Sequence, residues 1–418
     1  MHSESFPWWT TLPFPALVLA IAVLPIALSR LWEKRWFQIL TSGGCAAPVV
    51  YFFLTHQASA QLGHALSGYG SFVVTLTALF VTSGGIHLTG DIEATPKVNV
   101  CFLLAGALLA SLVGTTGASM LLIRPLLRTN RQREHRAHLV PFFILAVANA
   151  GGLLTPLGDP PLLVGYIEGV PFLWTLRLLP LWLMYVGSFA VALYLADKRA
   201  YARESASALS ADRTNVEPIR IRGQRNIFFL LAIVPAAMLP AGVRELSMLA
   251  ITLGSYFLTP RALHEENGFS FAPMADVAII FAGLFVCLGP IEAWLAQAAP
   301  HLPMQRGWQL FWGSGLLSAV LDNAPTYTAF AALARGLSVG QSGLIAGIAP
   351  FKLAAVSAGS VVMGATTYIG NGPNLMIKAI AEREHFPMPS FVRYAIFAFA
   401  TMLPVHVITT VALWWFDR

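Results

Sequence analysis

The apolar residues of this chain are gathered into long blocks that are separated by short polar stretches. Most blocks hold about 18–25 residues, the length that an α-helix needs to cross the hydrocarbon core of a lipid bilayer. The chain opens with three such blocks, at 12–29, 36–54 and 69–86. This pattern predicts an all-α integral membrane protein with about ten transmembrane helices.

Each half of the chain also contains two apolar segments that differ from simple spans. Residues 98–127 form one long block with the polar centre Gly114-Thr115-Thr116-Gly117, and residues 139–166 are interrupted by Gly, Asn, Asp and Pro. The second half repeats this pair of features at 308–333 and at 344–381. The remaining blocks have the pattern of ordinary spans, and they lie at 172–196, 226–241, 246–258, 275–291 and 391–415.

The basic residues indicate how the chain is oriented in the membrane. They produce a net charge of +6 and stand at the ends of apolar blocks, where positive charge marks the inner side. Arg30, Lys34 and Arg35 place the first loop inside and therefore the N-terminus outside. A simple crossing by residues 98–127 would leave the basic run that ends at Arg136 outside. We therefore expect a re-entrant hairpin there, with limbs of about 12–15 residues that are too short to span.

The two halves then have the same order of elements in opposite orientations. Residues 1–196 form the first repeat, and their hairpin 98–127 enters from the inner side. Residues 226–418 form the second repeat, and their hairpin 308–333 enters from the outer side. Residues 197–225 form a basic cytoplasmic linker. Inverted repeats with paired interrupted helices are typical of secondary transporters. The expected location is the inner (plasma) membrane, with the N-terminus on the periplasmic side.

The composition excludes most classes of soluble protein. The chain of 418 residues is 56% hydrophobic and 11% charged, whereas soluble domains carry about 25% charged residues. Because the basic residues flank apolar blocks, we expect no nucleic-acid partner. The sequence contains no HExxH or GxSxG motif, and its cysteines show no CxxC spacing, so we expect neither an enzyme nor a resident cofactor. The expected partners are the lipid bilayer and a small ion or solute.

The two interrupted segments correspond to each other. Gly158-Asp159-Pro160-Pro161 in the first half aligns with Gly370-Asn371-Gly372-Pro373 in the second. Each sequence is typical of a helix that stops, runs extended and restarts, since Pro is favoured in the first helical turn and Asp159 and Asn371 occupy N-cap positions. Unwound backbone is tolerated inside a membrane only where it is buried in protein or lines a cavity. Its carbonyl groups bind cations, and helix N-termini attract anions.

Asp159 and Asp322 are the main candidates for chemistry, because an acid deep in a span is costly and marks a functional site by default. Both acids have a structural alternative as N-caps, the asparagines have one as hydrogen-bonding groups between helices, and the hairpin-tip threonines have one as residues that form the tip. Together with Asn323, the two acids are the expected ligands of a transported Na⁺. The full candidate set for the ion or substrate is Asp159, Asp322, Asn323, Asn149, Thr155, Thr115, Thr116, Thr366, Thr367, Asn371 and Asn374.

At these residues the chain resembles the ion transporter superfamily. The string NAGGLLTPLGDPP at 149–161 is similar to the broken-helix motif of NhaD-type sodium/proton antiporters and of arsenite-efflux and citrate-transporter-like carriers. LDNAPT at 321–326 resembles their second hairpin, and FAGLFV at 281–286 resembles the span before it. The resemblance implies a homodimer with a scaffold part and a mobile transport part that works by an elevator-like motion. It also implies an ion site at Asp159, Asp322 and Asn323.

Three transport functions are compatible with these features. The leading interpretation is exchange of Na⁺ or a similar cation for H⁺, because a buried Asp can hold either ion. The alternative is Na⁺- or H⁺-coupled uptake of citrate or another carboxylate, which the helix N-termini would bind, and an arsenite-type oxyacid exporter comes third. The first tip lacks the Ser-Asn-Thr of the dicarboxylate branch, and the GNGPN string at 370–374 differs from the antiporter branch. The sequence therefore assigns no substrate, stoichiometry or direction of flux.

Overall fold

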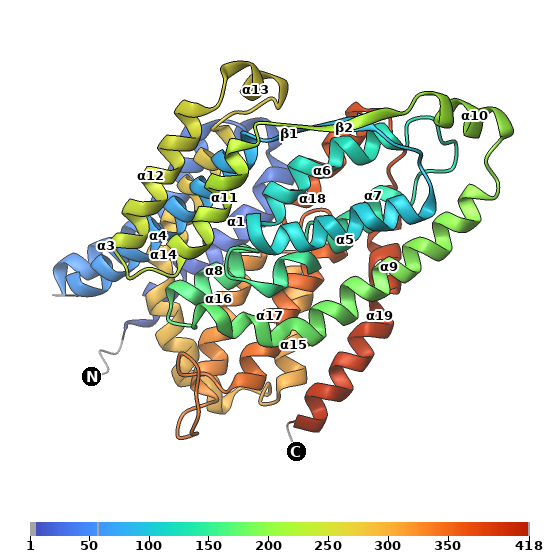
Figure 1. Cartoon of the computed structure of the whole chain (residues 1–418). Helices are drawn as coiled ribbons and strands as arrows, with labels where there is room; N and C mark the ends of the chain where they lie inside the picture. Colours follow the sequence, from blue (N-terminus) through green and yellow to red (C-terminus); the bar gives the residue numbers. More distant parts are fainter. Residues whose placement is uncertain (1–5, 57, 417–418) are drawn as a thin grey trace.

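The computed structural model describes residues 6–56 and 58–416 as a bundle of helices packed side by side (Figure 1). Seven helices of the described residues are long and apolar enough to cross a membrane, and two shorter apolar helices accompany them. The strands among these residues form one two-stranded sheet. The prediction of an all-α, multi-pass membrane protein is therefore confirmed.

The first half opens with three long helices. Pro13 starts α1 at the first helical position, where its missing N–H costs no hydrogen bond. The third helix, predicted to begin at Tyr69, begins at Ser59, because the polar stretch before Tyr69 contains no proline and its Ala, Gln and Leu residues favour helix. The elements are η1 (Trp8–Thr11), α1 (Pro13–Ala27), α2 (Ser29–Trp32), α3 (Arg35–Thr55) and α4 (Ser59–Gly84).

The long apolar segment 98–127 folds as two helices that pack on each other, α5 (Pro96–Val113) and α6 (Thr115–Thr129). They are joined at Gly114, whose φ of 82° lies in the region that favours glycine. The expected limb length of about 12–15 residues is wrong for α5, which has 18 residues. The helix is longer because Thr95 caps it ahead of the apolar block, accepting a 3.3 Å hydrogen bond from the backbone N–H of Val98.

The interrupted segment 139–166 contains two short helices with irregular backbone between them. After α7, a 3-10 turn, the extended Thr155, a turn at 156–158 and the extended Asp159 precede α8, which restarts at Pro160. The predicted extended run is thus limited to these two residues, because the backbone N–H of Gly158 bonds to the carbonyl of Thr155 and closes the turn. One long helix follows. The elements are α7 (Leu139–Ala146), η2 (Ala150–Leu154), α8 (Pro160–Ile167), η3 (Phe172–Leu178) and α9 (Leu179–Tyr201).

The second half has a similar order of elements. The segment 308–333 folds as α15 and α16, which are joined by the short stretch 319–322. The broken helix predicted from residue 344 begins only at Pro350, because glycines ahead of it adopt positive φ values that regular helix does not allow. The elements are α11 (Arg225–Ala237), α12 (Val243–Leu258), α13 (Arg261–Glu266), α14 (Ala272–Ala298), η4 (Ala299–His301), α15 (Gly307–Ser318), α16 (Asn323–Gly336), α17 (Pro350–Met363), η5 (Gly364–Thr366), α18 (Gly372–Arg383) and α19 (Phe391–Phe416).

The basic segment between the halves, 197–225, is more ordered than a simple linker. It contains α10 (Ala206–Thr214) and β2 (Glu217–Arg222), and β2 pairs antiparallel with β1 (His87–Asp91). Sequence analysis did not predict this sheet, because β1 has only five residues and its partner lies in the other half of the chain. The sheet and α10 lie together at one end of the bundle, at the top of Figure 1.

Two basic stretches of the chain meet at this end. The buried guanidinium group of Arg133, which follows α6, lies 2.7 Å from the carboxylate of Asp197 in α9 and 3.3 Å from that of Glu204. The basic run after α6 and the start of the linker therefore lie at the same end of the bundle.

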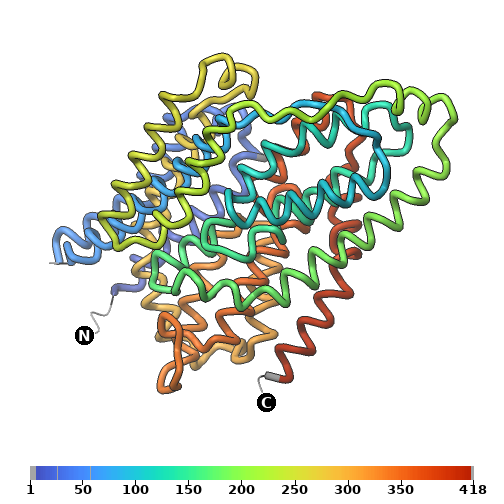
Figure 2. Tube along the Cα trace, viewed as in Figure 1, coloured from blue at the N-terminus to red at the C-terminus, as the bar shows by residue number. Residues whose placement is uncertain are grey.

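The helices form two groups that contact each other along a common face. One group consists of α1, α3, α4, α11, α12 and α14, and it lies mostly on the left of Figure 2. The other consists of α5 to α9 and α15 to α19, with a core that includes Phe143 and Phe189. Helices α8 and α16 lie at the boundary, because they also contact α4 and α14 of the first group.

Candidate functional site

The two interrupted helices each contain a break, at 147–159 between α7 and α8 and at 364–371 between α17 and α18. The two breaks have matching backbone conformations. Thr155 and Thr367 are both extended, with φ and ψ of −137° and 158° and of −132° and 166°. Asp159 and Asn371 are also extended, at −147° and 145° and at −153° and 136°, and each is the N-cap of the helix that follows. The alignment of Asp159 with Asn371 therefore describes equivalent local positions in the two halves.

Each break is held against the neighbouring helix pair by its threonine. The hydroxyl group of Thr155 donates a hydrogen bond to the backbone carbonyl of Ser111 in α5, and that of Thr367 donates one of 2.5 Å to the carbonyl of Ala319, just after α15. The backbone N–H of Thr115 adds a 2.8 Å hydrogen bond to the carbonyl of Gly158. The breaks and the tips of the helix pairs therefore form one connected centre.

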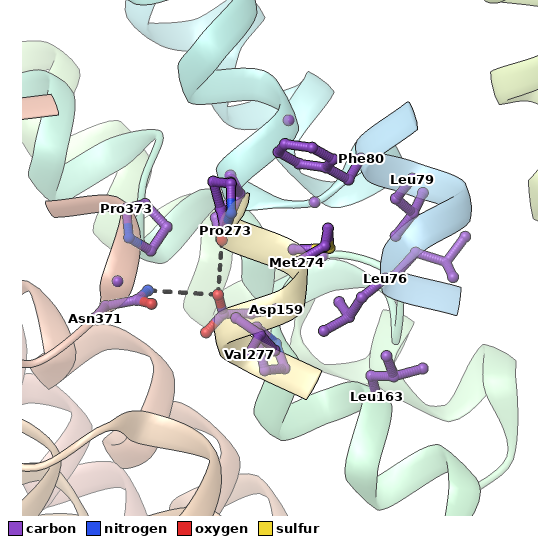
Figure 3. Close-up of a pocket in the computed structure, with 18 of the residues that line it drawn as sticks. Leu76, Leu79, Phe80, Asp159, Leu163, Pro273, Met274, Val277, Asn371 and Pro373 are labelled. Atoms are coloured by element: carbon purple, nitrogen blue, oxygen red, sulfur yellow. Dashed lines mark hydrogen bonds between the residues drawn. The ribbon is translucent and has the colours of Figure 1, made fainter. Parts of the chain in front are cut away.

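The carboxyl group of Asp159 is buried at this centre. Its Oδ1 accepts a 2.8 Å hydrogen bond from the hydroxyl of Thr115 and lies 3.5 Å from Nδ2 of Asn371, the contact drawn in Figure 3. Its Oδ2 accepts a 2.5 Å hydrogen bond from Nδ2 of Asn323. Uncharged donors from α6, from α16 and from the second break therefore converge on one acid.

A set of buried asparagines joins the two breaks to each other. Nδ2 of Asn371 donates to Oδ1 of Asn149 at 3.1 Å, and Nδ2 of Asn149 donates to Oδ1 of Asn374 at 2.8 Å. Nδ2 of Asn374 then donates to the carbonyl groups of Gly364 and Thr367, at 2.9 and 3.0 Å. Because the side-chain amides of Asn149 and Asn374 hydrogen-bond to other protein groups, these two residues hold the two breaks together.

Asp322 occupies the N-cap position of α16. One of its carboxylate oxygens accepts a 2.8 Å hydrogen bond from the backbone N–H of Asn323. Unlike Asp159, Asp322 is partly exposed, and both acids border the same cavity. Asp159 is thus surrounded by side-chain donors, whereas the carboxylate of Asp322 accepts a hydrogen bond from the backbone and is partly exposed.

The cavity has a volume of about 300 Å³ and lies between the two groups of helices. Its polar side is formed by the breaks and by the tips of the helix pairs, and α4 and α14 form an apolar wall. Figure 3 shows Asp159 and Asn371 opposite Leu76 and Leu79. Among the described residues, no Lys, Arg or His lines the cavity. The polar side includes Gly114, Thr115, Thr116, Gly117, Gly158, Asp159, Asp322, Asn371 and Gly372, and the wall includes Phe72, Leu76, Leu79, Phe80, Pro273, Met274, Val277 and Phe281.

The predicted site residues divide into two sets in the structure. Those that line the cavity are Thr115, Thr116, Asp159, Asp322 and Asn371. Those that stand outside it are Asn323, which hydrogen-bonds to Asp159, together with Asn149, Thr155, Thr366, Thr367 and Asn374. Most of this second set forms hydrogen bonds that shape the breaks.

Sequence analysis missed the apolar wall and one close packing contact. Leu76 and Met274 come from helices of the other group, and single apolar residues in a span carry no signal of a cavity. Gly152 lies behind Asp159, where an added Cβ would come within 2.8 Å of the side chains of Asp159 and Thr115. The Gly151-Gly152 pair in the interrupted segment is the only sequence signal for this contact.

Helix N-termini give the cavity a second kind of polar group. Helices α6, α8, α16 and α18 all begin at the cavity, beside the lining residues Thr115, Pro160, Asp322 and Gly372. The first N–H groups of a helix have no partner within it and carry partial positive charge. Helix α8 begins with Pro160 and Pro161, which have no N–H, and the N–H of Asn323 in α16 donates to Asp322, so the available groups belong mainly to α6 and α18. The arrangement therefore offers carboxylates to cations and helix N-termini to anions.

Comparison with known proteins identifies the family. No curated protein matches the chain. The family described as "Putative citrate transport" matches residues 3–415, nearly the whole length. This agrees with the superfamily that the broken-helix and hairpin strings indicate. The chain therefore belongs to this citrate transport family of the ion transporter superfamily.

Proposed function

We propose that this protein is a secondary transporter of citrate or a related carboxylate and that Na⁺ or H⁺ drives the transport. One observation carries the proposal: two carboxyl groups and the N-termini of α6 and α18 face a single cavity that no basic side chain of the described residues lines. A cavity of about 300 Å³ with an apolar wall is larger than a bare cation requires. An organic solute suits it better.

Helix N-termini would bind the carboxylate groups of the substrate. The N–H groups of Thr116 and Gly117 belong to the first turn of α6, and that of Gly372 belongs to the first turn of α18. Such groups bind anions without a formal positive charge nearby. The hydroxyl of Thr116 adds a further donor at the same border of the cavity.

Asp159 and Asp322 would hold the coupling ion. A buried carboxylate surrounded by neutral donors needs a proton or a cation to balance its charge. A substrate carboxylate in the same cavity adds negative charge, and no basic side chain of the described lining residues offsets it. Binding of the substrate therefore favours binding of Na⁺ or H⁺, and this mutual dependence couples the two fluxes.

The division of the helices into two groups supports a moving-part mechanism. In this proposal α1, α3, α4, α11, α12 and α14 form the scaffold of a homodimer, and the group that carries the breaks moves against α4 and α14. The basic end of the bundle, with the linker 197–225, would face the cytoplasm, which leaves the N-terminus on the periplasmic side.

Na⁺/H⁺ antiport is the second candidate, and it is favoured by the lack of a basic side chain at the cavity. Proteoliposomes distinguish the two functions. We expect a Na⁺ or pH gradient to drive accumulation of labelled citrate by at least about tenfold over protein-free vesicles, since a tenfold concentration ratio needs only about 1.4 kcal/mol. If no gradient drives uptake while added Na⁺ collapses an imposed pH gradient, the protein is an antiporter and the carboxylate proposal is wrong.

A further inference from the structure

A second polar cluster lies at the opposite ends of two helices that begin at the cavity. Glu168 follows the last turn of α8, and Arg335 lies in the last turn of α16. Nη2 of Arg335 lies 3.1 Å from Oε2 of Glu168. Glu292 comes from α14 of the other helix group. Both glutamates line a separate cavity of about 370 Å³.

We propose that Glu168 and Glu292 together bind one transported proton, as a second ion site distinct from Asp159 and Asp322. The inference rests on the proposed function, since it assigns a role to H⁺ in coupling. Two carboxyl groups can form a hydrogen bond with each other only when one of them is protonated, because a carboxylate has no donor. Two glutamates that line one cavity can therefore share a single proton between them.

The charges around the pair lead to the same conclusion. Two carboxylates and one guanidinium carry a net charge of −1, and one proton makes the cluster neutral. Oε1 of Glu292 is buried and has no hydrogen-bond partner in the described structure. The other titratable groups that face the pair are His64, an exposed residue of α4 at the cavity border, and Tyr327 of α16. Neither of them offers Glu292 a permanent positive charge.

The cluster is mechanically connected to the candidate substrate cavity. Helix α8 begins at Asp159 and ends at Glu168, about 14 Å along its axis at 1.5 Å per residue, and α16 joins Asn323 to Arg335 in the same way. A movement of α8 and α16 against α14 would separate Glu168 from Glu292. On separation the O–H bond of the protonated carboxyl group breaks, and the proton passes to water in the 370 Å³ cavity.

The test compares E292Q and E168Q with the matched control E384Q. Glu384 ends α18 as Glu168 ends α8, but it is exposed. Infrared spectroscopy of the purified full-length protein near neutral pH detects the carbonyl stretch of a protonated carboxyl group. We expect E292Q to lose the intensity of one such group relative to the wild type and E384Q to retain it. Equal band intensity in the wild type and in E292Q would overturn the proposal.

Transport gives an independent readout. In E292Q, exchange of labelled citrate for unlabelled citrate should stay within about twofold of the wild type, whereas accumulation driven by a pH gradient should fall by at least about tenfold, equivalent to about 1.4 kcal/mol. Retained pH-driven accumulation overturns the proton site. If the wild type transports no carboxylate, the proposed function fails, and the infrared comparison alone decides the proton site. If E292Q does not fold, E168Q provides the same comparisons.

Discussion

Nδ2 of Asn323 lies 2.5 Å from Oδ2 of Asp159, although 164 residues separate them in the chain. Asn323 is the first residue of α16, and Thr115, the first residue of α6, donates to the other oxygen of the same carboxyl group. The tips of both helix pairs therefore hold one acid from the first break. Any movement of either tip changes the surroundings of Asp159.

The substitution Asp159→Asn should abolish coupled transport without unfolding the protein. The amide keeps the shape of the side chain but cannot hold a proton or a cation. We expect transport to fall at least about tenfold, since hydrogen bonds to charged groups contribute about 1.5–3 kcal/mol. Uptake in proteoliposomes and elution from a size-exclusion column check the two expectations. The control is Asp276→Asn, at a half-exposed acid near the start of α14. Equal uptake by both variants contradicts the role of Asp159.

Two substitutions at Asp322 separate its N-cap role from a role in binding the ion. Asp322→Ala removes the cap and should reduce the stability of the protein by about 0.5–2 kcal/mol, whereas Asp322→Asn keeps a good cap. Both substitutions should impair transport if the carboxylate binds the coupling ion. Thermal unfolding in detergent and labelled-substrate uptake measure the two effects. Normal transport by Asp322→Asn would show that Asp322 is only an N-cap.

Gly152→Ala should impair transport more than it impairs folding. The new methyl group would lie 2.8 Å from side-chain atoms of both Asp159 and Thr115 and would push them apart. The equivalent change Gly364→Ala meets its nearest atoms at 3.1–3.3 Å and should have a smaller effect, and Gly43→Ala meets nothing within 4 Å. The loss of apparent substrate affinity should be largest in Gly152→Ala, smaller in Gly364→Ala and negligible in Gly43→Ala. The same affinity in all three variants would show that the Asp159–Thr115 contact does not shape the site.

Asn374→Leu should destabilise the connection between the two breaks. The change removes the hydrogen bonds to the carbonyl groups of Gly364 and Thr367 and leaves Nδ2 of Asn149 with one acceptor fewer. Each buried polar group that loses its partner costs about 1–3 kcal/mol. We expect a clear decrease of the melting temperature in detergent. Asn215→Leu, the same change at an exposed position, should leave it nearly unchanged. An unchanged melting temperature in Asn374→Leu is the contrary result.

The stability of the basic end should depend on pH through Glu204. Burial acts to raise the pKa of Glu204, but hydrogen bonds from the backbone N–H groups of Glu134 and His135 and from Arg133 outweigh it, so its pKa lies below the ordinary value. Because the folded-state pKa is lowered, the carboxylate stabilises the protein above the unfolded-state pKa of about 4.3, and this contribution is lost as the pH falls further. Glu204→Gln should lower the melting temperature at pH 7 and reduce its change between pH 7 and acidic pH. Equal pH dependence in the variant and the wild type would contradict this role.

Local sequence patterns predict much of the architecture. Apolar blocks of membrane length predict the long helices, because the backbone N–H and C=O groups of a segment inside lipid must hydrogen-bond to each other. Pro160 and Gly114 mark points where backbone geometry changes, and the structure has a helix start and a turn there. Helix ends are less predictable, as α4 shows, because polar residues with good helix propensity continue a helix beyond its apolar block.

The sequence by itself determined the membrane class of this protein, the two interrupted helices and the acids Asp159 and Asp322 within apolar segments, because these depend on local hydrophobicity and on backbone restrictions at Pro and Gly. Only the tertiary structure decided which polar groups meet. It brings Asn323 and Thr115 to Asp159, directs Asn149 and Asn374 into the framework, and places Glu168 and Glu292 at one cavity. Those contacts join residues far apart in the chain, and they depend on how the helices pack, which no local pattern encodes.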